Sequence, residues 1–212
     1  MMKVLFTTIS IYAALLCSLA RAHDLKDGVV ERDVQVVIFP DRVEFQYTIE
    51  MNARTRDKYL DEMRSKHLLE SKDTRSSSAD RKPVAKWDQF RNQVAPHLAK
   101  NLRLTVAGED LPLSVLGTET IEKHSIKLYF VFSRKYRVPS SSVSLRIQDD
   151  NFSEHDGYHR LALKGRRGVA IVNSTVPPIV SSLPRKTWSK LSKKEKSAAT
   201  TARADFSLES TD

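Results

Sequence analysis

The strictest pattern in this chain is an alternation of apolar and polar side chains over residues 43–51. Every second residue is apolar, and the residues between them are polar; the apolar set is Val43, Phe45, Tyr47, Ile49 and Met51. A period of two predicts a β-strand with one buried face and one face in water. A second alternating run, residues 34–38, comes before it across Pro40-Asp41. We therefore predict an antiparallel hairpin joined by residues 39–42.

Strand-like runs separated by turn residues continue along the chain. They cover residues 102–106, 111–116, 126–132, 143–147, 161–163 and 169–171. We expect the first two of these runs to form a second hairpin. About eight short strands with this spacing favour two packed sheets, so the predicted fold class is mainly β, an antiparallel Ig-like β-sandwich. Over residues 52–100 the apolar spacing becomes that of amphipathic helices, which predicts an inserted helical pair.

The first 22 residues have the pattern of an export signal. Lys3 is its positive start, residues 4–19 are mostly apolar, and Ala20-Arg21-Ala22 is a small-x-small cleavage site. Cleavage after Ala22 makes His23 the new N-terminus. We expect a signal peptide over residues 1–22, an exported chain that works in the periplasm or outside the cell, and one β-sandwich domain over residues 23–184.

Charge and cysteine content limit what the exported chain can bind. The only cysteine, Cys17, lies in the predicted signal, which excludes disulfides and cysteine-ligated metals in the rest of the chain. The formal net charge is +9, and Arg185 to Arg203 holds seven basic residues against one acidic residue. Residues 185–212 are therefore predicted to be a basic, flexible tail with a short helix around residues 188–196. Such a tail attracts anionic lipid or envelope polymers, while nucleic acid is the less favoured partner.

The sequence carries no common catalytic motif, so we predict that the protein is not an enzyme. It has no nucleophile motif, phosphate-binding glycine loop, dinucleotide fingerprint or zinc-protease helix, and it contains only six glycines. Hydrolysis of an envelope polymer is the enzymatic alternative, because carboxylates are dense at Asp149, Asp150, Glu154 and Asp156. No apolar run of about 18 residues follows the signal, so we expect no transmembrane helix.

The same segment carries the candidate metal site. An N-terminal His23 can chelate a metal with its α-amine and its ring nitrogen. In this hypothesis His155 or His159 supplies a further nitrogen, and Asp24 or Asp156 supplies an oxygen or orients an imidazole. Sites rich in nitrogen suit copper, nickel or zinc. The alternative is an exposed acidic loop whose histidines only face solvent.

Several short motifs occur in the order found in one known family. They are Ala22-His23, Arg32 to Val36, Pro40 to Val43, Phe45 to Met51, Leu98 to Leu102, Gly108 to Leu113, and Asn151-Phe152 before Leu161 to Leu163. In these motifs the chain resembles the exported N-terminal domain that precedes the membrane helices of bacterial nickel/cobalt transporter-like proteins, including relatives of hydrogenase- and urease-associated metal permeases. The resemblance implies a free-standing extracytoplasmic domain that binds a transition metal or assists a separate membrane transporter.

Two hypotheses about function follow from these observations. The leading one is an exported, envelope-associated binding protein for a divalent transition metal. The alternative, from another class, is a structural or interaction module that docks on an anionic envelope surface through its basic tail.

Overall fold

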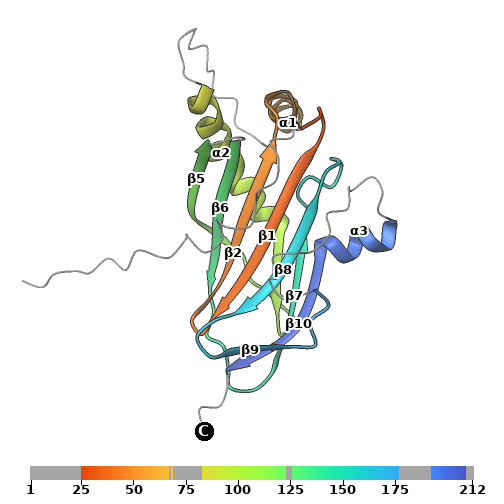
Figure 1. The fold of residues 1–212 in the computed structure, drawn as a ribbon. Coiled ribbons are helices and arrows are strands. Elements are labelled where there is room, and N and C mark those ends of the chain that lie inside the picture. The colour runs from red at the N-terminus through yellow and green to blue at the C-terminus, as the bar shows by residue number, and fades with distance from the viewer. Residues whose placement is uncertain (1–24, 67, 69–82, 123–125, 177–191, 209–212) are drawn as a thin grey trace, which may run out of the picture.

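The computed structural model describes residues 25–66, 68, 83–122, 126–176 and 192–208. Over these residues the protein is mainly β, with two five-stranded sheets and three helices (Figure 1). The first sheet has the order β5-β6-β2-β1-β8 and consists of β1 (Val30–Phe39), β2 (Arg42–Met51), β5 (Ser114–Glu122), β6 (Ile126–Lys135) and β8 (His159–Gly165). The second has the order β4-β3-β7-β10-β9 and consists of β3 (Leu102–Val106), β4 (Glu109–Asp110), β7 (Val143–Asp149), β9 (Val169–Val172) and β10 (Thr201–Leu208).

The hairpin predicted from the alternating runs is confirmed. β1 and β2 pair antiparallel from Val30 opposite Met51 to Phe39 opposite Arg42. The apolar positions of β2 are buried, as a period of two requires. Among the described strands every other pairing is antiparallel except that of β1 with β8, which is parallel. The mainly β class with two sheets is confirmed, and the Ig-like topology stays a prediction.

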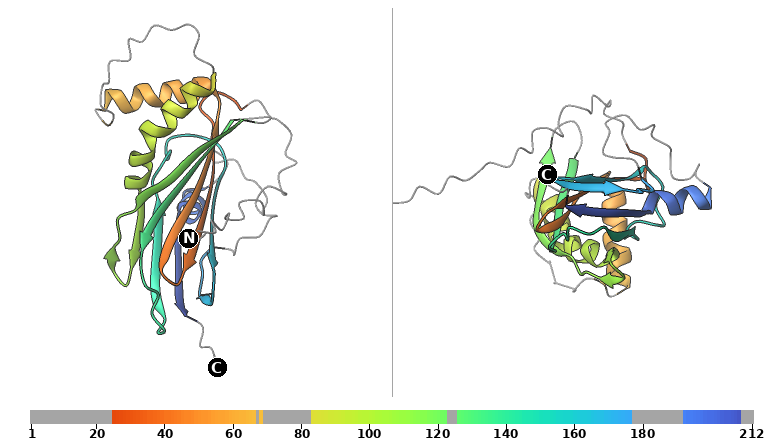
Figure 2. Two further views of the ribbon diagram at one scale, coloured as in Figure 1. Left: turned by 90° about the vertical axis from the view of Figure 1, so that its left-hand side faces the viewer. Right: turned by 90° about the horizontal axis from the view of Figure 1, so that it is seen from below.

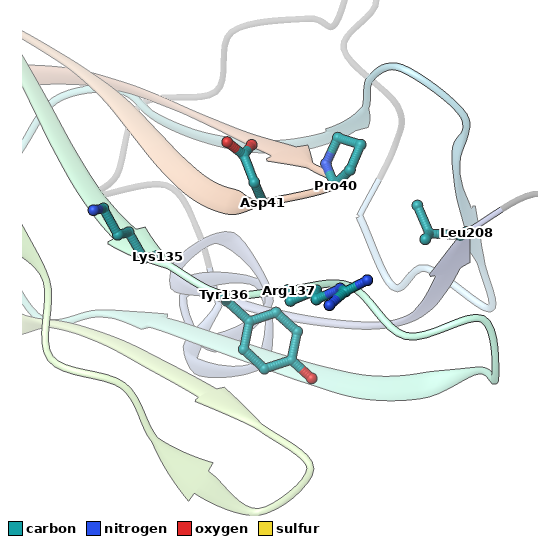
Figure 3. Close-up of a pocket in the computed structure, with 6 residues that line it drawn as sticks. All are labelled: Pro40, Asp41, Lys135, Tyr136, Arg137 and Leu208. Carbon is teal, nitrogen blue, oxygen red and sulfur yellow. The ribbon is translucent and has the colours of Figure 1, made fainter.

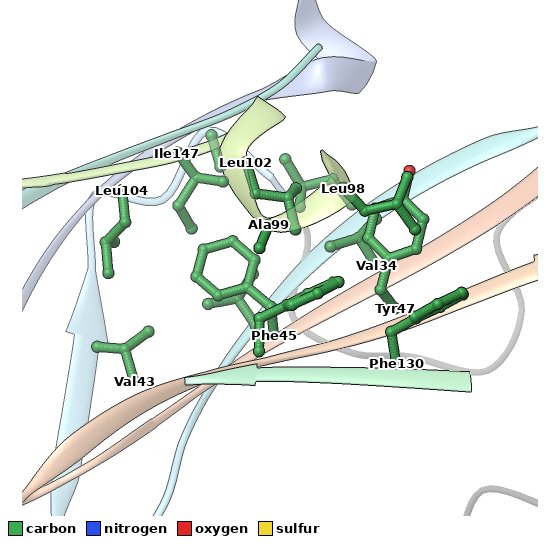
Figure 4. Packing of buried hydrophobic residues seen from close by; sticks show 14 of the residues in the cluster. Val34, Val43, Phe45, Tyr47, Leu98, Ala99, Leu102, Leu104, Phe130 and Ile147 are labelled. Atoms are coloured by element: carbon green, nitrogen blue, oxygen red, sulfur yellow. The ribbon is translucent and has the colours of Figure 1, made fainter. Parts of the chain in front are cut away.

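One hydrophobic core lies between the two sheets. Figure 4 shows Val43 and Phe45 of β2 close to Leu104 of β3 and Ile147 of β7, and all four side chains are buried. Both inner faces therefore contribute to the same core, which is the arrangement of a β-sandwich.

The inserted helical pair is also confirmed. The two helices, α1 (Ala53–Ser65) and α2 (Pro83–Asn101), lie between β2 and β3 in the chain, and α2 packs on β5 and β6 (Figure 2). The side chain of Asn52 caps α1 by accepting a hydrogen bond from the Thr55 amide at 2.7 Å. The buried face of α2 includes Trp87, Phe90, Val94 and Leu98, at the spacing of an amphipathic helix.

The prediction of a flexible tail is wrong for residues 192–208. They form α3 (Lys193–Thr200) and β10, and β10 lies in the second sheet between β7 and β9. Ala202 and Phe206 of β10 have no exposed area. The domain therefore extends beyond Pro184 to Leu208, and residues 185–191 lie outside the described residues.

The second predicted hairpin also differs from the structure. β3 turns into the two-residue strand β4, and from residues 111–116 the Leu111 amide donates a hydrogen bond to the Leu104 carbonyl of β3 at 2.7 Å. β5 begins at Ser114 and pairs with β6 in the other sheet. The run that follows the Gly108 turn thus crosses between the sheets, a change of partner that alternation cannot reveal.

No helix within the described ranges combines the length and the apolar character that crossing a bilayer requires. The signal peptide predicted over residues 1–22 lies outside those ranges and stays a prediction.

Candidate functional site

The loop of residues 149–159, in which we include the last residue of β7 and the first residue of β8, lies against the start of β1. Val29 forms a parallel bridge with Asp156, and the Val30 amide donates a hydrogen bond to the Asp156 carbonyl at 2.7 Å. These contacts continue the parallel pairing of β1 with β8 into the loop. The chain at Val29 and Val30, which follows the predicted N-terminal ligands in the sequence, therefore lies beside the loop.

Gly157 makes this close approach possible. Its φ is 132°, in the region that favours glycine, and a Cβ at this position would lie 2.3 Å from the Val30 carbonyl oxygen. Any larger residue would push the loop away from β1.

The N-terminal segment is also fixed to the start of α1. The side-chain amide of Asn52 donates to the Leu25 carbonyl and to Asp27, both at 2.8 Å, and the Gly28 amide donates to the Thr55 hydroxyl at 2.8 Å. Hydrogen bonds from Asn52 and Arg54 lower the pKa of Asp27. His23 and Asp24 lie outside the described residues, directly before Leu25 in the sequence.

His155 lies in the loop and packs on the same helix. Its ring centroid is 5.6 Å from that of Tyr59 in α1 and 5.7 Å from that of Phe152. The residue is half-buried, and burial lowers its pKa while Glu62 and Glu154 act in the opposite direction. The imidazole is therefore neutral at pH 7, which is the form that binds a metal.

His159, at the start of β8, lies in a different environment. Its Nε2 is 2.9 Å from Oδ2 of Asp149, and neither side chain has exposed area. The Tyr47 hydroxyl donates to the same oxygen at 3.0 Å, and the Asn151 amide donates to Oδ1 at 3.0 Å. Because a carboxylate only accepts hydrogen bonds, Nε2 of His159 carries the proton that it shares with Asp149.

Arg32 provides the positive charge that faces this carboxylate. It is 1% exposed, and one guanidinium nitrogen donates to the Asn151 carbonyl. Burial alone raises the pKa of Asp149, but the hydrogen bond from His159 and the charge of Arg32 bring this pKa below its ordinary value of 3.8. Burial lowers the pKa of His159. We conclude that Asp149 is ionised and His159 neutral at pH 7.

This buried cluster connects the two sheets. Arg32, Tyr47 and His159 come from β1, β2 and β8 of the first sheet, and Asp149 ends β7 of the second. Hydrogen bonds in a medium that excludes water are directional and costly to break, so the cluster fixes how the sheets align.

Of the predicted ligands within the described ranges, His155 and Asp156 are half-buried in the loop and His159 is buried in the cluster. Across the described part of the chain, no three His, Cys, Asp or Glu side chains are grouped so that they could hold a metal ion. The metal site that the sequence predicts at His155 also includes His23 and Asp24, which lie outside the described residues.

The sequence prediction missed Arg32 and Tyr47 as partners of Asp149, although one signal was present. Arg32 is an even number of residues away from Val30, Val34 and Val36, so the alternation places this cation on the same buried face of β1. A charge at such a position requires a buried partner.

A hollow lies at the opposite end of β1 (Figure 3). Its lining is formed by Pro40, Asp41, Lys135, Tyr136, Arg137 and Leu208. β1 has ten residues, so about 30 Å separates this hollow from the loop around Asp156.

Comparison of the chain with models of known protein families and with curated proteins found no match.

Proposed function

We propose that this protein is an exported, envelope-associated binding protein that takes a divalent transition metal where its N-terminal segment meets the loop of residues 149–159. The observation that carries this proposal is the backbone pairing of Val29 and Val30 with Asp156. It brings the chain that follows His23 next to the loop that contains His155 and Asp156.

The ligands in this proposal are the α-amine and imidazole of His23 together with the imidazole of His155. His23 lies two residues before Leu25, and an extended chain of two residues spans roughly 7 Å. Residues 26–29 form a turn in which the Val29 amide donates to the Lys26 carbonyl at 3.2 Å. The ring of His155 packs against Tyr59 of α1. The segment that follows His23 is hydrogen-bonded to the start of the same helix. Asp24 and Asp156 are the available oxygen donors. When bound at such a site, copper, nickel or zinc would be held mainly by nitrogen.

His159 has a positioning role in this proposal. Its ring nitrogen is bonded to Asp149, so it holds the end of the loop against β7. The resemblance to transporter-associated domains adds a separate membrane transporter as the proposed partner.

The test is calorimetric titration of copper(II), nickel(II) and zinc(II) into protein that begins at His23. We expect one-to-one binding that weakens on the order of tenfold to a hundredfold when one extra residue precedes His23 or when His155 is replaced by Gln. His97→Gln is the matched control, because His97 is also half-buried with a pKa lowered by burial, and it lies on α2. Binding that is the same in all four proteins would reject the site.

A further inference from the structure

Basic side chains gather at the end of the first sheet that holds the hollow of Figure 3. We call this surface the basic end and define it as Arg42, Arg134, Lys135, Arg137, Lys164, Arg166 and Arg167. These residues come from the β1–β2 turn, the chain around the end of β6, and the end of β8 with its following turn. In Figure 1 these three segments lie at the lower end of the sheet.

Backbone hydrogen bonds hold the three segments together. The Tyr136 amide donates to the Asp41 carbonyl at 3.1 Å, and the Val138 amide donates to the Pro40 carbonyl at 2.9 Å. The Arg166 amide donates to the Ile38 carbonyl at 2.9 Å. The positions of the basic residues relative to one another are therefore set by the fold.

Among the described residues, most of the basic side chains at this end have no ion-pair partner. Arg42 is paired with Asp41 at 3.0 Å and with Glu44 at 2.5 Å. In contrast, Lys135, Arg137, Arg166 and Arg167 are exposed, and none of them forms an ion pair with a residue that the structure describes. Glu109 is another acidic residue in this region. Burial raises the pKa of Tyr136, and the negative charge of Glu109 raises it further.

An aromatic ring supports part of this surface. The Arg42 guanidinium lies 4.0 Å from the centroid of the Phe39 ring, and the Arg167 guanidinium lies 5.9 Å from it. Both distances lie in the range in which an aromatic ring attracts a cation, so Phe39 stabilises a cation from the start of β2 and one from the turn after β8.

We propose that the basic end docks on the anionic phospholipid headgroups of a membrane. Four uncompensated cations on neighbouring turns can contact several phosphates that lie in one plane, and each basic residue near such a surface strengthens binding about fivefold. Guanidinium groups also form paired hydrogen bonds with phosphate oxygens.

The basic end is less suited to a nucleic acid than to a membrane surface. Single-stranded nucleic acids are held by aromatic side chains that stack on bases. The two aromatic rings at the basic end already have partners, because Arg42 lies over Phe39 and Tyr136 packs on the buried Phe206 with the ring centroids 6.0 Å apart. The large hydrophobic residues that are exposed in the described part of the chain are Leu68, Val115, Leu116 and Val172, and none is aromatic.

The docking surface also differs from the predicted basic tail. The described lysines of that region lie in α3, which precedes β10, whereas Leu208 at the end of β10 lines the hollow. Eight residues of strand, roughly 25 Å, separate the two.

The test is cosedimentation of the full exported chain with vesicles of phosphatidylcholine alone or with added phosphatidylglycerol. The variant replaces Lys135, Arg137 and Arg166 with Gln and Arg167 with Asn, because Arg167 has a φ of 55°, which Asn tolerates. The matched control removes four exposed charges elsewhere, at Lys66, Lys86, Lys193 and Lys194. Circular dichroism and thermal unfolding verify that both variants are folded.

We expect the wild type to bind only vesicles with phosphatidylglycerol and to dissociate at high salt. The basic-end variant should bind on the order of several hundredfold more weakly, and the control should keep most of its affinity. Equal losses in the two variants would show attraction by net charge alone and would overturn the proposal. Absence of vesicle binding, or binding to DNA or polyphosphate without vesicle binding, would overturn it as well.

Discussion

Asp149 and Arg32 are each 1% exposed, and they carry opposite charges in the interior of the sandwich. Removing two charges from water is costly, and the cost is recovered only where geometry and hydrogen bonding are good. Asp149 receives hydrogen bonds from Tyr47, His159 and the Asn151 amide. At the scale of the residue, this carboxylate is the position where a small change has the largest effect.

Asp149→Ala should lower the free energy of unfolding by about 3–5 kcal/mol, because it leaves the buried Arg32 without its opposite charge and the buried Tyr47 and His159 without their acceptor. Asp150→Ala is the matched control, since Asp150 is exposed and pairs with Arg103 at 2.7 Å. We expect the control to cost at most about 1 kcal/mol. Urea unfolding followed by circular dichroism measures both values, and equal effects would contradict the assigned role of Asp149.

The sequence could not separate His155 from His159. Both lie in one acidic run, and the spacing of four residues has no meaning outside a helix. The difference arises because β8 begins at His159 and directs its side chain into the core, whereas His155 is in the preceding loop. Which histidine is buried thus depends on where a strand starts, and element boundaries are the least certain part of a sequence-based prediction.

At the scale of the element, strands with large apolar residues on one face were predicted and β10 was not. β1, β2 and β6 carry Val, Ile, Phe and Leu on alternate positions, a strong strand signal. In β10 the inward positions are Ala202, Ala204 and Phe206, and alanine has a low strand propensity. The charged residues between them, Arg203 and Asp205, made this segment resemble a solvent-exposed tail in composition.

Truncation after Pro184 should prevent folding, because it removes β10 from between β7 and β9 and the buried Phe206 with it. Loss of a buried phenylalanine alone costs about 3–5 kcal/mol. Truncation after Leu208 leaves every described strand in place and should leave the unfolding midpoint nearly unchanged. Thermal unfolding of the two truncated proteins measures this difference. A cooperative transition in the shorter protein would contradict the position of β10.

At the scale of the whole molecule, the two proposed sites lie at opposite ends of β1. The loop around Asp156 meets the start of this strand, and the hollow beside Lys135 lies past its end. If the basic end rests on a membrane, the candidate metal site points away from it. The two proposals therefore do not compete for one surface.

Stability should fall as the pH drops from about 7 to about 5. Burial lowers the pKa of His97, His155 and His159 below the ordinary value of 6.5, so the unfolded chain binds more protons than the folded one in this range. The contribution of Asp149, whose pKa is lowered from 3.8, is lost only at more acidic pH.

Urea unfolding at several pH values in this range measures the slope. His159→Gln should flatten it more than His97→Gln, because His159 is the more deeply buried of the two. A stability that increases toward pH 5 would contradict the neutral state assigned to His159.

The position of β10 has a consequence for the order in which this chain becomes a folded protein. β7 and β9 are both synthesised before β10, yet each pairs with β10 and not with the other. The second sheet can therefore close only after residue 208 has left the ribosome. For the exported protein that we propose, this order means that the second sheet is completed only by the last strand to cross the membrane.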